Sequence, residues 1–116
     1  MAELSENDRL TIESIARSCA SIQTRIVMYK IDEELFRESD YRQMAVSPLA
    51  QISKDARELS SEFMASHGDL PLDDVVQMGD QVASDLDSLD VAQAWSLVND
   101  KIEPLRRACV KLLSDR

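Results

Sequence analysis

Apolar residues recur at steps of three and four along most of this chain, and that spacing places them on one face of an α-helix. The repeat predicts a long helix from about Asn7 to Tyr29, with Asn7 or Asp8 as its N-cap. The 116 residues include two glycines and three prolines, too few for a β-protein rich in turns. The chain is therefore expected to be all-α. The apolar stripe of the first helix consists of Ile12, Ile15, Cys19, Ile22 and Ile26.

A second long helix is predicted from Ser39 or Asp40, as its N-cap, to Gly68. Pro48 lies inside this run, and a proline there removes one backbone hydrogen bond and bends the helix axis. We expect a kink at Pro48, with a full break at Ser47 as the alternative. The stripe of this helix contains Met44, Ala45, Leu49, Ile52, Ala56, Leu59 and Phe63.

Three more helices complete the expected fold. A short one follows Asp32, another has Pro71 in its first turn and ends near Asp87, and a third long helix is capped by Ser88 and kinked at Pro104. The prediction is thus a bundle of about five helices, three long and two short. Because residues 1–116 contain no repeat and no linker, we expect one domain.

The net charge and the distribution of apolar residues limit which kinds of partner the chain is expected to bind. The chain has 13 basic and 22 acidic residues, and its net charge of −9 repels phosphate backbones, so no RNA partner is expected. No apolar run approaches the ~20 residues of a membrane span, and the polar start lacks the apolar core of a signal peptide. We therefore expect a cytoplasmic protein with no membrane contact.

The histidine, the two cysteines and the aspartates give little indication of a catalytic or metal-binding site. His67 has no second histidine or cysteine nearby and is interpreted as a solvated loop residue. Cys19 and Cys109 lack the paired spacing of a metal site and are interpreted as reduced core cysteines. A group of aspartates is explained by helix N-termini rather than by a cation, so neither metal nor cofactor is expected. These aspartates are Asp73, Asp74, Asp80, Asp85, Asp87 and Asp90.

Three arginines recur every eight positions on the first helix, namely Arg9, Arg17 and Arg25. That spacing drifts by ~80° per step around a helix, so the three side chains form no straight phosphate-binding stripe. Acidic neighbours at helical spacing, such as Glu13 before Arg17, predict ordinary solvated ion pairs instead.

Two segments, Val46–Phe63 and Leu70–Val98, resemble the HepT-like branch of the HEPN superfamily. These are helical-bundle toxins, and their partners are minimal nucleotidyltransferase antitoxins. Members carry Met-Arg-Asn, three residues, His, one residue and Tyr, followed by an Asp and a Trp. Met78, Asp90 and Trp95 fit that spacing without a gap, and a weaker likeness covers nearly the whole chain. The resemblance implies a HEPN-type bundle that forms homodimers.

The reactive positions of the family motif differ in this chain. Gly79 stands where the Arg is expected, Asp80 where the Asn is, Ser84 where the His is and Leu86 where the Tyr is. Lys54 stands where a Glu is usual. In the family the His moves protons and the Arg stabilises charge on the phosphate, while the Tyr accepts adenylylation. Serine does not titrate near neutral pH and glycine has no side chain, so ribonuclease activity is not expected.

The leading hypothesis is a catalytically inactive HepT-like protein that acts by forming a homodimer or by binding a partner, such as a nucleotidyltransferase-type antitoxin. The alternatives are a ribonuclease that uses Ser84, Asp85 or Lys54, and an unrelated helical adaptor. Candidates for the dimer surface or cleft are Met78, Val82, Asp85, Leu86 and Leu89.

Overall fold

Every regular element that the computed structural model describes, over residues 4–114, is a helix, which confirms the all-α prediction. In chain order the elements are α1 (Glu6–Met28), α2 (Glu33–Phe36), α3 (Ser39–Val46), α4 (Pro48–Ala56), α5 (Ser61–Ser66), α6 (Asp73–Ser84), the 3-10 turn η1 (Leu86–Ser88), α7 (Val91–Asp100) and α8 (Ile102–Ser114).

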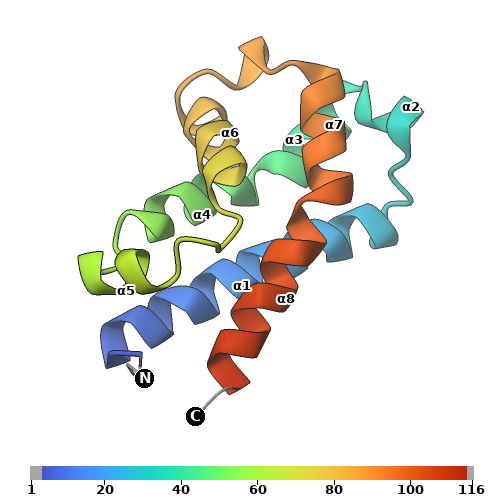
Figure 1. Cartoon of the computed structure of the whole chain (residues 1–116). Helices are drawn as coiled ribbons and strands as arrows, with labels where there is room; N and C mark the ends of the chain where they lie inside the picture. The colour runs from blue at the N-terminus through green and yellow to red at the C-terminus, as the bar shows by residue number, and fades with distance from the viewer. Residues whose placement is uncertain (1–3, 115–116) are drawn as a thin grey trace.

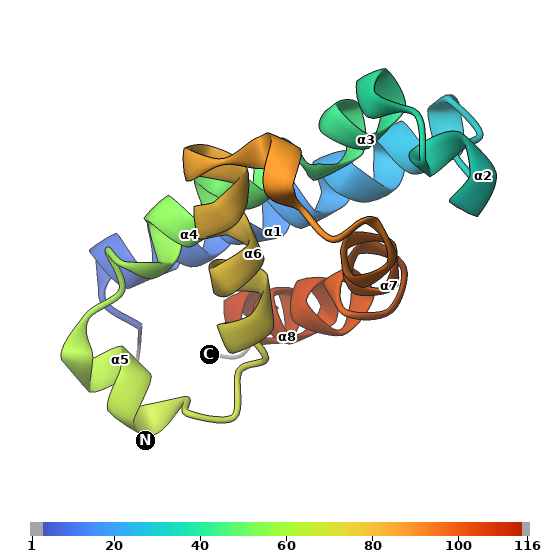
Figure 2. The same cartoon turned by 90° about the horizontal axis from the view of Figure 1, so that it is seen from above.

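The helices form an elongated bundle of 45 × 26 × 19 Å. Its main pairings are α1 with α8, α1 with α4, and α4 with α6, so α1 and α4 form the middle of the molecule (Figure 1). Viewed from above, α6 crosses α4, and α7 leads into α8 along the other side (Figure 2). Arg9 near the start of α1 donates to the Leu113 carbonyl near the end of α8, so these two helices are antiparallel.

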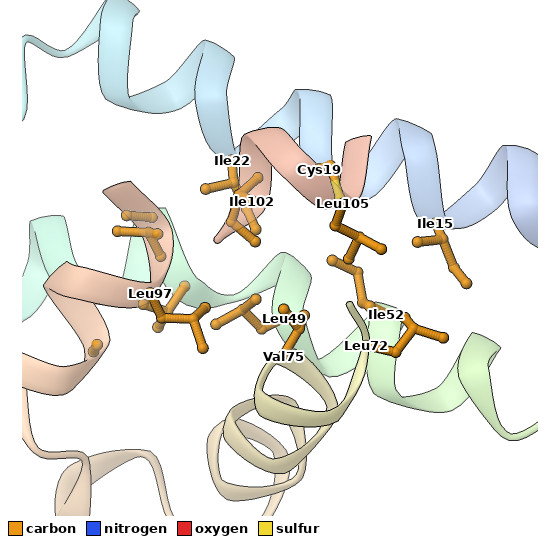
Figure 3. Packing of buried hydrophobic residues seen from close by; sticks show 14 of the residues in the cluster. Ile15, Cys19, Ile22, Leu49, Ile52, Leu72, Val75, Leu97, Ile102 and Leu105 are labelled. Atoms are coloured by element: carbon orange, nitrogen blue, oxygen red, sulfur yellow. The ribbon is translucent and has the colours of Figure 1, made fainter. Parts of the chain in front are cut away.

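The core lies between these pairings. Ile12, Ile15, Cys19 and Ile22 of the predicted α1 stripe are fully buried, whereas Ile26 is half-buried. Ile102 and Leu105 of α8 meet this stripe from one side (Figure 3). Leu49 and Ile52 of α4 pack near Leu72 and Val75, which precede and begin α6 (Figure 3). Each such side chain contributes ~1.5–3 kcal/mol when fully buried.

The cap of α1 differs from the prediction. Ser5 is the N-cap, and its hydroxyl accepts the Asp8 N–H at 3.0 Å. Asp8 is instead 4% exposed, and its carboxylate accepts the N–H of Ser60 at 2.9 Å and the Ser60 hydroxyl at 2.6 Å. Because Ser60 also caps α5, Asp8 ties the starts of α1 and α5 together.

The helix predicted from residue 40 to Gly68 is divided into α3, α4 and α5, so the expectation of one kinked helix was wrong. The first division lies at Ser47, whose φ of −55° and ψ of −36° keep the chain in the helical region. Pro48 has no N–H for the Met44 carbonyl, and that carbonyl accepts Nη1 of Arg25 at 2.8 Å instead. The second division follows Arg57, the C-cap of α4.

The last predicted helix is also divided. Asp90, rather than Ser88, is the N-cap of α7, and its carboxylate accepts the Gln93 N–H at 3.0 Å. The chain breaks at Lys101, so Pro104 lies in the first turn of α8, where its missing N–H costs no helical hydrogen bond. The preceding helix α6 ends at Ser84, three residues before the predicted end. No helix within residues 4–114 is long and apolar enough to cross a membrane.

Candidate functional site

Gly79, where the resemblance predicts an arginine, is buried where α6 crosses α4. A Cβ atom at this position would clash with the carbonyl oxygen of Leu49 and would lie 2.8 Å from Cβ of Ser53. Glycine is therefore required for the close approach of the two helices. An arginine side chain has no room here, so this position contributes packing rather than an open catalytic site.

Asp80, the next motif position, belongs to a charged cluster that bridges the same two helices. Its carboxylate accepts the Ser53 hydroxyl and Nη2 of Arg57, the latter at 2.6 Å. Nη1 of Arg57 also donates to the Ser53 hydroxyl at 2.7 Å. The hydrogen bonds from Arg57 and then from Ser53 lower the pKa of Asp80 to about 2. The carboxylate is therefore ionised and paired at neutral pH, when a general acid or base would need to exchange a proton.

The remaining degenerate positions lie at the ends of α4 and α6. Ser84, at the position of the family histidine, is exposed and donates to the Asp80 carbonyl of its own helix at 2.9 Å. Asp85, the C-cap of α6, and Lys54, in the last turn of α4, are both exposed. Within residues 4–114, no hydrogen bond or ion pair joins Lys54, Ser84 and Asp85 to one another, so the structure forms no linked set of ribonuclease residues from them.

The three residues that fit the spacing of the HepT-like motif, Met78, Asp90 and Trp95, have structural roles. Met78 is half-buried against the core. Asp90 caps α7, and Trp95 on the same helix packs against Phe36 with ring centroids 5.2 Å apart. These three residues therefore serve packing and helix capping within the domain.

A cleft of about 370 Å³ lies beside Met78, between α6 and α7. Lys101 and Asp74 form an ion pair of 3.5 Å at this cleft. The sequence did not predict this cleft. The one sequence feature that indicates a polar helix face here is the four-residue spacing of Gln77 and Gln81. Its lining consists of Asp74, Gln77, Met78, Gln81, Gln93, Ser96, Leu97 and Lys101.

The candidates for a dimer surface are only partly exposed. Leu89 is 7% exposed and belongs to the core of the domain, which removes it from any such surface. Val82 and Leu86 are half-buried and pack against the core, as Met78 does. The candidate surface therefore reduces to the exposed edges of these three residues together with Asp85.

The other reactive residues lie elsewhere. His67 lies in the loop after α5 as predicted, but it is half-buried as the C-cap of that helix, and its ring stacks on Phe63 at 4.4 Å between centroids. Cys19 and Cys109 are free and fully buried, and burial raises their pKa values to about 12 and about 11. Among the described residues, no three His, Cys, Asp or Glu side chains are placed to hold a metal ion.

Comparison with known proteins adds no relative, because no family model, no curated protein and no solved structure matches the chain. Membership of the HepT-like family therefore stays a prediction from the motif spacing.

Proposed function

We propose that this chain is a HepT-like protein without ribonuclease chemistry that acts by binding protein, first of all as a homodimer. One observation carries the proposal: the residues at three positions of α6 where the family has reactive side chains are used inside the domain. Gly79 fills the crossing with α4, Asp80 is paired with Arg57, and Ser84 bonds to its own helix.

Cleavage of RNA without a metal requires a group that exchanges a proton near neutral pH and a cation that stabilises the phosphate. Here Arg57, the cation beside Asp80, already donates hydrogen bonds to Asp80 and Ser53. The low pKa of Asp80 keeps this carboxylate from exchanging a proton near neutral pH. This arrangement favours a binding role over catalysis.

The surface for the homodimer is formed by the edges of Met78 and Val82, which lie four residues apart on α6, and of Leu86, which begins η1 after α6 ends at Ser84. A twofold contact between two such strips would bring the α6 helices of both copies together. A nucleotidyltransferase-type protein is the heterologous partner that the resemblance suggests.

Light scattering at high micromolar concentration tests the homodimer. We expect a dimer for the natural chain and a monomer for Val82→Glu and for Leu86→Glu. Val110→Glu, an equal change at an exposed residue of α8, should stay dimeric. Circular dichroism melts confirm that each variant folds. A natural chain that is strictly monomeric would contradict the proposed dimer.

An assay with labelled single-stranded RNA tests whether the protein lacks ribonuclease activity. We expect no cleavage by the purified protein. Cleavage that Lys54→Ala or Asp85→Ala abolishes would instead assign ribonuclease activity to these exposed residues.

A further inference from the structure

Two depressions adjoin on the face of α1 that is turned away from α8. The first, called here the arginine trough, has a volume of about 370 Å³ and is lined by Ser14, Arg17, Ser18, Ser21, Arg25, Ser47, Pro48 and Gln51. The second, called the methionine hollow, has a volume of about 580 Å³ and is lined by Ala20, Ser21, Thr24, Arg25, Met28, Tyr29 and Met44. Because Ser21 and Arg25 line both, the two depressions form one continuous surface.

The charge of this surface is opposite to that of the molecule. Neither depression is lined by a carboxylate, although acidic residues outnumber basic ones by 22 to 13 in the chain. Arg17 is exposed and forms no ion pair with any carboxylate of residues 4–114, so the pair with Glu13 that the sequence predicts is not formed. Asp55 lies buried behind the trough and balances one of its two positive charges, leaving a surplus of one.

Arg25 is held in a fixed position. Its Nη1 donates to the Met44 carbonyl and to the Ser47 hydroxyl, each at 2.8 Å. These bonds order the guanidinium before any partner arrives, so binding at its other nitrogens loses little side-chain entropy. A planar, preorganised guanidinium is suited to bind a carboxylate.

The end of α1 beside the hollow is apolar and exposed. Met28 and Tyr29, which line the hollow, are 67% and 48% exposed, and Val27 is 75% exposed on an adjoining side of the helix. An exposed apolar group of this kind next to a charged depression is typical of a docking surface for protein. Methionine adapts to different apolar side chains, because it is flexible and polarizable.

We propose that this face of α1 docks a segment of a partner protein that places carboxylates against Arg17 and Arg25 and one bulky apolar side chain in the methionine hollow. Eight residues of helix separate the two arginines by ~12 Å, which sets the spacing of the partner carboxylates. The inference rests on the proposed binding function and adds a second surface to it, distinct from the α6 strip.

An acidic protein segment fits better than a polyanion. A phosphate backbone would meet the same arginines but would bring no apolar side chain to the hollow, and the net charge of −9 repels it at long range. An anionic membrane surface would be repelled likewise, since Asp32, Glu33 and Glu34 lie within five residues of Tyr29 at the apolar end of α1.

The test is selection of a random dodecapeptide phage library on the full chain. Enriched peptides should contain at least two acidic residues and one of Leu, Met, Phe or Trp. In fluorescence polarisation, Arg17→Glu and Met28→Asp should each weaken binding of a labelled enriched peptide about tenfold. Arg25 is left unchanged because it also holds the Met44 carbonyl.

Two matched variants on α8, Lys111→Glu and Val110→Asp, change charge and polarity equally and should bind like the natural chain. The inference is overturned if no peptide is enriched, if the enriched peptides lack acidic residues, or if the α1 variants bind as well as the controls. It is also overturned if labelled single-stranded RNA or phosphatidylserine vesicles bind and Arg17→Glu abolishes that binding.

Light scattering distinguishes the α1 docking surface from the proposed homodimer surface on α6. The α1 variants should remain dimeric, whereas Val82→Glu should lose the dimer and still bind the peptide. Peptide binding by a strictly monomeric natural chain would overturn the dimer but not the α1 surface.

Discussion

The hydrogen atom that serves as the side chain of Gly79 sets the distance between α4 and α6. Replacement by alanine forces a methyl group onto the Leu49 carbonyl, and overpacking of this kind costs ~1–3 kcal/mol. Alanine recovers ~1 kcal/mol through its higher helix propensity. Because the clash is with backbone, we expect Gly79→Ala to lower the free energy of unfolding by about 2 kcal/mol, measured by urea denaturation.

Gly68 provides the matched control for this measurement. A Cβ atom there would lie 3.9 Å from its nearest neighbour, the Met64 carbonyl, so Gly68→Ala should be neutral or slightly stabilising. Equal effects at positions 68 and 79 would show that the crossing does not require glycine.

The ionisation of Asp80, at the crossing of α4 and α6, makes the free energy of unfolding depend on pH. Its pKa lies at about 2 in the folded chain against 3.8 for the free side chain, so its contribution is complete above pH 3.8 and is lost as the pH falls toward 2. We therefore expect Asp80→Asn to lose less stability than the natural chain between pH 4 and pH 2, as measured by urea denaturation at each pH. Added salt should reduce the difference, because the pair with Arg57 is exposed. Parallel pH curves for the two chains would contradict this role.

At the scale of the element, α1 ends in a conformation that its sequence does not favour. Lys30 has a φ of 51°, and the bonds from Lys30 N–H to the Val27 carbonyl and from Ile31 N–H to the Ile26 carbonyl close a Schellman motif. A residue with a Cβ loses ~1–2 kcal/mol in this region. Lys30→Gly should therefore raise the midpoint of thermal unfolding, with a gain of about 1 kcal/mol. Lys54→Gly, inside α4, should lower it.

Helical periodicity predicted which residues form the core of α1 but not where the later helices divide. Pro48 and Pro104 were expected to bend helices, and both lie instead in the first turn of a new helix. The division at Ser47 depends on Arg25, which comes from another helix to bond the carbonyl that Pro48 leaves without a donor. The start of α5 depends on Asp8 in the same way. Such long-range partners have no signature in a local pattern.

At the scale of the whole molecule, the spacing of the motif directed attention to α6 and predicted which of its positions differ from the HepT-like family. It did not show that Gly79 lies inside a helix crossing or that Leu89 belongs to the core, because both depend on how α6 lies across the bundle. The α1 surface was missed because the arginines were assigned ion pairs from spacing alone, whereas Arg25 bonds to a backbone carbonyl.

The reactivity of the two buried cysteine thiols can be used to measure how often the helical bundle opens. Both are fully buried between α1 and α8, and burial raises their thiol pKa values to about 12 and about 11. We expect the native chain to react with Ellman reagent at least about a hundredfold more slowly than the chain in guanidinium, since only the open state exposes the thiols. A fast reaction of either thiol in the native chain would mean that α1 and α8 separate locally.

The tight crossing at Gly79 also limits how this sequence can evolve. Any larger side chain acquired at position 79 in a single step would meet the Leu49 backbone and destabilise the domain. It could be accommodated only after α4 had first moved, through changes that bring no benefit of their own. Position 79 is therefore expected to stay glycine in the descendants of this chain, even where neighbouring exposed positions change.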